Sequence, residues 1–216
     1  ICLSGMTTLR KEMESNNLKI TRDFLVYLNK ASSDYILKGG TALNVCYGMN
    51  RVTDGIDLDG FDTNIVSIID NFVKEYRTKL RYEVDKDTDK VKRVFIHYNN
   101  GKPLKIEVSY RRKDKRTCLC GWVNGILVYG IKEIMAMKIN AFTNRDKIRD
   151  LYDVVFIYTR YKNALSPDII MSLRNIVAYK GIEQFDYLIK DQKDDLINNN
   201  KLAENFLTMY YDLGLI

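Results

Sequence analysis

Hydrophobic positions recur with a helical period at the start of the chain. From residue 9 to about residue 33 the apolar side chains are spaced as on a helix, which predicts one or two N-terminal helices. A short apolar run over residues 35–37 then stops at two adjacent glycines, and residues 41–47 continue with a helical pattern. The order predicts a strand, a glycine turn and a helix in direct succession.

The next segment alternates between apolar and acidic residues. Ile56 and Leu58 point to one face and Asp57 and Asp59 to the other, as in a half-buried strand over residues 56–61. A helix is predicted from residue 65 to about residue 80. Three further strands are predicted over residues 82–85, 91–98 and 104–110, with residues 99–102 as the turn of a hairpin between the last two.

Near residue 130 the pattern becomes helical to the end of the chain. Residues 126–129 give the last β-like run. Helices are predicted over residues 131–144, 146–160, 166–179 and 182–213, the last with a break near residues 190–194. We therefore predict an α+β chain with two domains, an α/β core over residues 1–130 and a helical domain over residues 131–216.

Composition narrows the class of protein only moderately. The 216 residues are 46% hydrophobic and carry a net charge of +6, which favours polyanionic partners such as RNA or nucleotide phosphates, although spread cations also serve plain solubility. The four cysteines and the single histidine lack the spacing of a zinc site. We therefore expect these cysteines to be reduced thiols. No apolar run is long enough to span a bilayer, so we also expect no membrane partner and a cytoplasmic location.

The glycine turn is a candidate phosphate site. Two glycines between a strand and a helix let a phosphate approach the backbone, and the helix N-terminus adds unpaired N–H groups and partial positive charge. Lys38, Gly39, Gly40 and Thr41 are therefore candidates for holding a triphosphate. A plain structural turn is the alternative.

Three carboxylates are candidate ligands of Mg²⁺. Asp57 and Asp59 lie two residues apart on one strand face, within reach of one cation, and Mg²⁺ prefers oxygen ligands. Glu107, on a neighbouring strand, is the candidate for a third carboxylate in a two-ion phosphoryl transfer site. The alternatives are a solvated strand face and, for Glu107, surface pairs with Lys105 or Arg111.

The helix over residues 131–144 places cations on an apolar face. Lys138 and Arg145 share one arc with apolar residues, and Lys138 is a candidate phosphate ligand, with snorkelling to the helix edge as the alternative. In the next helix Asp150 borders the apolar stripe and is a candidate for aligning Lys138 or acting as a base. Arg149 and Asp153 lie opposite that stripe and are predicted to form only a surface ion pair.

Three stretches together resemble the AbiEii/AbiGii toxin family. They are residues 37–43 (Leu-Lys-Gly-Gly-Thr-Ala-Leu), residues 51–59 (Arg-Val-Thr-Asp-Gly-Ile-Asp-Leu-Asp) and residues 138–153. The resemblance implies a nucleotidyltransferase fold, a mixed sheet with flanking helices followed by a helical half that covers the nucleotide. It implies NTP as substrate, Mg²⁺, an RNA acceptor such as tRNA, and an antitoxin encoded nearby.

The resemblance also assigns roles to residues. The glycine turn and the Asp-x-Asp pair would bind NTP and metal, and the lysine and late aspartate of the family fall on Lys138 and Asp150. The predicted catalytic residues are Asp57, Asp59, Glu107, Lys138 and Asp150, and the first three of these are the predicted metal ligands. The predicted nucleotide-binding residues are Lys38, Gly39, Gly40, Thr41, Arg51, Thr53, Lys138 and Arg145.

One position departs from the family pattern. The first catalytic aspartate of the family falls on Gly55. Three interpretations are open: Asp57 and Asp59 act as a shifted pair, the protein is an inactive relative, or a detoxifying substitution was introduced at residue 55. The sequence therefore supports two functions, transfer of a nucleoside monophosphate to RNA or protein, and binding of nucleotide or a partner without transfer.

Overall fold

A mixed sheet is the centre of the first of two units into which the chain divides, Ile1–Tyr129 and Gly130–Ile216. The structure is a computed structural model. It describes residues 2–76, 79–98, 102–111, 119–192, 194 and 197–215, with side chains in the first helix described from residue 16 onward.

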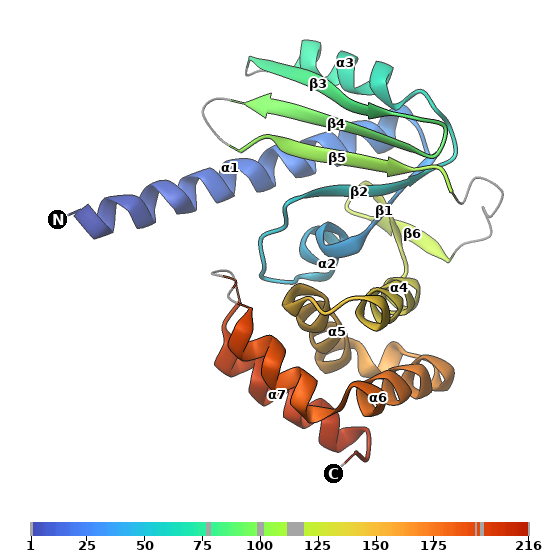
Figure 1. Ribbon diagram of the computed structural model, residues 1–216. Helices are drawn as coiled ribbons and strands as arrows, with labels where there is room; N and C mark the ends of the chain where they lie inside the picture. The colour runs from blue at the N-terminus through green and yellow to red at the C-terminus, as the bar shows by residue number, and fades with distance from the viewer. Residues whose placement is uncertain are drawn as a thin grey trace. The chain divides into compact units, whose positions relative to one another are not determined.

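Seven strands form the sheet within the described residues, in the order β3-β4-β5-β2-β1-β7-β6 (Figure 1). β2 runs parallel to β5 and β1 runs parallel to β7, whereas the other neighbours are antiparallel. The predicted α+β class with a mixed sheet is confirmed. The strands are β1 (Tyr35–Lys38), β2 (Gly55–Gly60), β3 (Leu80–Asp87), β4 (Val91–Tyr98), β5 (Leu104–Ser109), β6 (Cys120–Val123) and β7 (Ile126–Tyr129).

Three helices accompany this sheet: α1 (Cys2–Ala31), α2 (Gly39–Tyr47) and α3 (Ile65–Glu75). α1 and α3 contact each other and lie behind β3 to β5 in Figure 1, while α2 contacts β1, β2 and β7. The buried amide of Asn29 fixes α1, because it donates to Tyr35 O at 3.0 Å and accepts from Leu127 N at 2.9 Å. One polar side chain thus joins α1 to two strands.

The predicted elements of this unit differ from the structure mainly at their ends. The helix predicted to run to about residue 80 ends at Glu75, and the strand predicted over residues 82–85 extends over Leu80–Asp87. The short strand β6 was not predicted. Most of the predicted hairpin turn, residues 99–101, lies outside the described residues, as do residues 112–118 of the basic stretch and Cys118.

The second unit is helical. Its elements are α4 (Ile131–Asn144), α5 (Ile148–Tyr161), a 3₁₀ turn (Lys162–Ala164), α6 (Pro167–Asp191) and α7 (Asn199–Asp212). Gly181 has φ 71° and ψ 168°, a conformation open to glycine, and it kinks α6 between the two predicted helices 166–179 and 182–213. No described helix combines the length and apolar character that crossing a bilayer requires.

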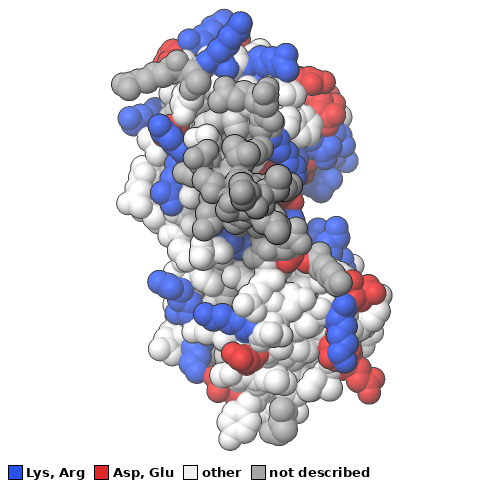
Figure 2. Space-filling model, turned by 90° about the vertical axis from the view of Figure 1, so that its left-hand side faces the viewer, with Lys and Arg blue, Asp and Glu red and all other residues white. Residues whose placement is uncertain are grey.

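Basic side chains do not gather in one block on the face drawn in Figure 2, where Lys and Arg lie scattered among acidic and uncharged residues. This agrees with the spread of cations along the sequence. The net charge alone therefore does not identify a binding surface.

Candidate functional site

The glycine turn brings the start of α2 against a carboxylate. Gly39 is the first residue of α2 and has φ 75°. A Cβ at Gly39 would lie 3.1 Å from Asp57 Oδ2, so the absence of a side chain lets the carboxylate approach the helix N-terminus. The backbone N–H groups of this first helical turn and the helix dipole favour an anion at the same place.

A row of charged residues crosses four strands of the sheet beside this turn. Asp57 lies directly opposite Lys38 of β1 and Glu107 of β5, and Glu107 lies opposite Arg93 of β4. Residues directly opposite each other share a face of the sheet, with Cβ atoms about 5 Å apart. Two carboxylates therefore stand side by side in the middle of the row, an arrangement that is unfavourable unless a cation compensates it.

Lys38 contacts Asp59. Its amine donates to Asp59 Oδ1, and the Tyr129 hydroxyl donates to Asp59 Oδ2 at 2.8 Å. Asp59 is 1% exposed, so its charge is buried with a cation and a hydroxyl as partners. Both oxygens of Asp59 serve these contacts, and the predicted half-buried strand is buried on its acidic face at this residue.

Glu107 contacts Arg93 instead of the predicted Lys105 or Arg111. Arg93 Nε donates to Glu107 Oε2 at 2.8 Å, and Arg93 Nη1 donates to Asp85 Oδ2 at 3.1 Å. The hydrogen bond to Glu107, followed by the one to Asp85, raises the pKa of the Arg93 guanidinium above its ordinary value. The arginine fixes one oxygen of Glu107, and a carboxylate has a second oxygen available for a cation.

Asp57, Asp59 and Glu107, the three predicted metal ligands, differ in their surroundings. Across the part of the chain that the structure describes, no three His, Cys, Asp or Glu side chains gather as a metal site. Mg²⁺ in nucleotide sites commonly takes one or two protein carboxylates together with substrate phosphates. The carboxylates of Asp57 and Glu107 are adjacent and partly exposed, and both oxygens of Asp59 accept hydrogen bonds.

Thr41 and Thr53 join α2 to the segment before β2. The Thr41 hydroxyl donates to Gly55 O and lies 2.7 Å from Thr53 Oγ1. Arg51 is only 4% exposed, and its guanidinium donates to Val52 O at 3.3 Å. Together with residues of α1 and α2, Arg51 and Thr53 line a pocket of about 260 Å³.

Gly55 is packed too closely for a side chain. A Cβ at this position would lie 2.6 Å from Lys105 O and 2.9 Å from Lys105 Cβ. Because one of the two atoms belongs to the backbone of the paired strand, a larger residue would require the strands to shift. An aspartate at residue 55 does not fit this backbone as it stands.

An ion cluster that is buried apart from the exposed Arg145 side chain lies in the second unit. Lys138 Nζ lies 2.6 Å from Asp153 Oδ2 and 3.6 Å from Asp150 Oδ1. Arg145 donates two hydrogen bonds to Asp150, from Nε to Oδ2 at 2.6 Å and from Nη2 to Oδ1 at 3.0 Å. The structure thus brings Lys138, Arg145 and Asp150 together, with Asp153 as a fourth member.

The predicted surface pair between Arg149 and Asp153 was wrong. Asp153 is fully buried and contacts Lys138, whereas Arg149 Nε donates to Asp194 Oδ2 at 2.5 Å. α5 contacts both α4 and α7, so residues opposite its apolar stripe are also covered. Snorkelling of Lys138 is excluded by the same contacts, because its side chain is 12% exposed and ends on buried carboxylates.

Sequence reasoning missed Arg93 and Asp153. For Arg93 the predicted four-residue turn over residues 99–102 is misleading, because counting back equally from it places Val94 opposite Glu107, whereas the observed register pairs Glu107 with Arg93. Asp153 carried no usable signal, because helical periodicity marks apolar faces and gives no indication of a buried aspartate paired with lysine.

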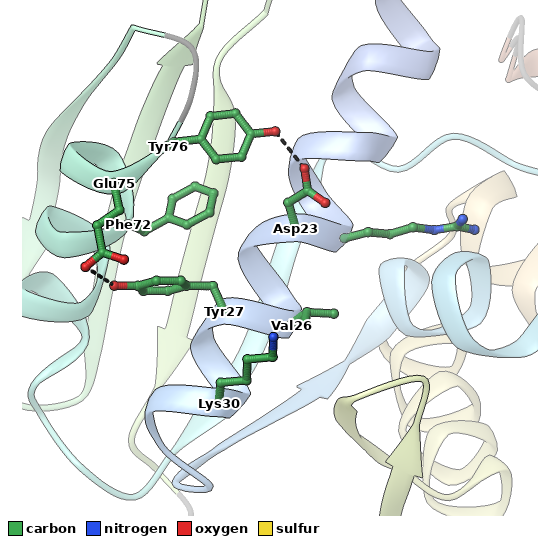
Figure 3. A pocket seen from close by; sticks show the side chains of 8 residues that line it. Asp23, Val26, Tyr27, Lys30, Phe72, Glu75 and Tyr76 are labelled. Carbon is green, nitrogen blue, oxygen red and sulfur yellow. Dashed lines mark hydrogen bonds between the residues drawn. The ribbon is translucent and has the colours of Figure 1, made fainter.

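A second groove lies between α1 and α3 and has a volume of about 350 Å³ (Figure 3). Phe72 lies between the rings of Tyr27 and Tyr76, with centroids 5.3 Å and 5.0 Å away. Tyr27 donates to Glu75 at 3.1 Å and Tyr76 donates to Asp23 at 2.7 Å. Burial, followed by the bond to Asp23, raises the pKa of Tyr76 to about 12, so the hydroxyl keeps its proton and holds the two helices together.

Two cysteines with described side chains, Cys46 and Cys120, are thiols. Cys46 and Cys120 are free, and burial raises the pKa of the Cys46 thiol to about 11. A thiol with a raised pKa is a weak nucleophile near neutral pH. Cys46 is therefore a packing residue rather than a reactive one.

Replacing Gly39 by alanine should weaken nucleotide binding. Alanine at φ 75° is strained by about 1–2 kcal/mol, and its Cβ would press on the Asp57 carboxylate. Gly125→Ala is the matched control, because Gly125 has φ 79° but a Cβ there would come no closer than 3.8 Å to Val26. Urea denaturation should show similar losses of stability in both variants, and calorimetry should show weaker NTP binding only in Gly39→Ala. Equal NTP affinities of the two variants would contradict a role of Gly39 in phosphate binding.

One family model matches most of the chain. The family model described as nucleotidyl transferase AbiEii toxin, type IV TA system, matches residues 23–213. No curated protein matches the chain significantly.

Two solved structures resemble the whole chain in fold. JHP933 from Helicobacter pylori is 24% identical with a TM-score of 0.78, over 94% of this chain and 92% of that one. MenT4, a nucleotidyltransferase toxin from Mycobacterium tuberculosis H37Rv, is 17% identical with a TM-score of 0.51, over 85% of this chain and 70% of that one. At these identities the likeness shows a shared fold.

Proposed function

Because the chain belongs to the AbiEii nucleotidyltransferase toxin family, we propose that it transfers a nucleoside monophosphate from an NTP, with Mg²⁺, to an RNA such as tRNA or to a protein. The acceptor hydroxyl attacks the α-phosphorus, the new P–O bond forms as the bond to the β-phosphate oxygen breaks, and pyrophosphate leaves. The hydroxyl proton passes to a base or to water.

One observation carries this proposal. Asp57 and Glu107 lie directly opposite each other on neighbouring parallel strands, and Asp57 also lies against the N-terminus of α2 at Gly39. A helix N-terminus attracts phosphates, and two adjacent carboxylates attract a divalent cation. The same small region therefore suits both components of a magnesium nucleotide.

The residues of the chain have distinct parts in the proposed reaction. Backbone N–H groups at Gly39 and Gly40 would hold phosphate oxygens, and Asp57 and Glu107 would hold Mg²⁺. When bound, the ion would withdraw charge from the transferring phosphoryl group. The contacts of Asp59 with Lys38 and Tyr129 join β2 to β1 and β7 next to the glycine turn.

The buried cluster of the second unit belongs to the proposal as well. We assign Lys138 and Arg145 to phosphate binding and Asp150 to aligning Lys138, because Asp150 lies within ion-pair distance of both cations. Arg51 and Thr53 are assigned to nucleotide binding. Family membership supports an antitoxin partner, and the free thiols fit a reducing compartment such as the cytoplasm.

Radiolabelling tests the proposed transfer. The purified chain would be incubated with Mg²⁺, each of the four α-³²P NTPs in turn, and either total RNA or a protein lysate. We expect label on a macromolecule together with release of pyrophosphate, and loss of both when EDTA is added. Absence of label with all four nucleotides and both acceptor pools would refute the transfer.

Gly55 favours a second candidate, a family member that binds nucleotide without transferring it. The first aspartate of the family pattern is absent there, and a Cβ at residue 55 would overlap the backbone of Lys105. We expect Gly55→Asp to lower the free energy of unfolding by about 1–3 kcal/mol, as overpacking does, and to leave transfer unchanged.

Melting curves and the labelling assay check this prediction. Transfer that rises in Gly55→Asp without loss of stability would show that glycine disables an otherwise complete site. NTP binding by calorimetry with no transfer in either protein would favour the second candidate.

A further inference from the structure

A β-bulge directs Asp85 toward Arg93. β3 and β4 pair at Val84 with Val94 and resume at Lys86 with Arg93, so Asp85 is the extra residue between the two pairs. Bulges change the direction of a side chain and occur often beside active sites. Here the bulged Asp85 accepts a hydrogen bond from Arg93 Nη1.

Arg93 also donates a hydrogen bond to Glu107. Its Nε donates to Glu107 Oε2 at 2.8 Å, directly across the β4–β5 pair. The guanidinium is planar, so acceptors on two of its nitrogens fix both its position and its plane. Two carboxylates from different strands therefore orient one arginine, and that arginine orients Glu107.

Glu107 is also the neighbour of Asp57. The register places the two carboxylates opposite each other on β5 and β2. Glu107 is 31% exposed and Arg93 is 35% exposed, so burial alone does not restrict either side chain. The hydrogen bonds are what limit the positions that the Glu107 carboxylate can take.

We infer that Asp85 and Arg93 are positioning residues that orient the carboxylate of Glu107 for a divalent cation held with Asp57. The inference rests on the proposed function, because it takes Glu107 as a metal ligand. Partners that hydrogen-bond a ligating carboxylate typically change metal affinity by about 10–100-fold when removed. Arg93→Gln should cause a loss of this size, and Asp85→Asn a smaller loss in the same direction.

Electron paramagnetic resonance of Mn²⁺ tests the inference without measuring activity. Mn²⁺ would be titrated in the presence of α,β-methylene nucleoside triphosphates. We expect the apparent Kd for Mn²⁺ to rise about 10–100-fold in Arg93→Gln. The rise should be smaller in Arg93→Lys, which keeps the charge but lacks the planar guanidinium with its several donors. The matched control is Arg81→Gln, because Arg81 is an exposed arginine of β3 opposite His97, outside the charged row.

Two results would overturn the inference. One is an Mn²⁺ affinity in Arg93→Gln equal to that of Arg81→Gln, whatever happens to the melting temperature. The other is an unchanged affinity in Glu107→Gln, which would remove Glu107 from the metal site itself. Failure of the wild-type chain to label any acceptor would refute the proposed transfer instead, and the Mn²⁺ comparison would still decide the positioning role.

Discussion

Asp57→Asn is expected to lower nucleotide transfer by at least about 1,000-fold, on the order of 4 kcal/mol in transition-state stabilisation, with little change in stability. Asparagine keeps the shape of the side chain but loses the charge that would bind Mg²⁺. Asp57 is partly exposed beside Gly39, and asparagine has nearly the same size as aspartate. Initial rates of labelling and thermal melts measure the two effects separately.

Asp59→Asn provides the matched comparison, and it should lower stability while it retains transfer. It would leave the Lys38 amine without its buried counter-ion, which we expect to cost about 3 kcal/mol of unfolding free energy. If Asp57 and Asp59 were a shifted catalytic pair, both variants would lose transfer and keep their stability. That outcome would show that the Lys38 and Tyr129 contacts are incidental.

Asp153→Asn is expected to destabilise the second unit by about 3–5 kcal/mol, because removing one partner leaves the other charge buried. Lys138 would retain only the more distant Asp150, 3.6 Å away. Urea denaturation followed by circular dichroism measures the loss. Lys162→Met is the control, since its pair with Asp212 is far more exposed and should contribute little to stability.

A double variant separates packing from chemistry at this cluster. Lys138→Met combined with Asp153→Leu removes both charges, and we expect it to recover most of the lost stability. If Lys138 also neutralises the triphosphate, the double variant will fold and still fail to transfer. Full transfer by the folded double variant would remove Lys138 from the reaction.

Local signals made part of the candidate site predictable. The strand, glycine turn and helix around Gly39 follow from adjacent residues, and the alternation in β2 places Asp57 on the acidic face of its strand. That this face lies beside the turn depends on the pairing of β1 with β2. Glu107 needed one further assumption, that β5 is a neighbour of β2, which the sheet confirms.

Features that depend on packing were not predictable. Asp59 follows the same alternation as Asp57, yet it is buried because Lys38 and Tyr129 come from two other strands to meet it. Asp153 is covered because α5 has neighbours on more than one side. β6 is four residues long and largely exposed, so it has no hydrophobic pattern to detect.

The bulge at Asp85 also affects how copies of the chain meet in concentrated solution. β3 is the outermost strand on one side of the sheet, and it is largely exposed and interrupted by an irregular pairing step. Unbroken, uncharged outer strands act as templates for added strands, whereas a kink and a dense run of charges oppose this. The residue that orients Arg93 thereby also helps to protect this border of the sheet from aggregation.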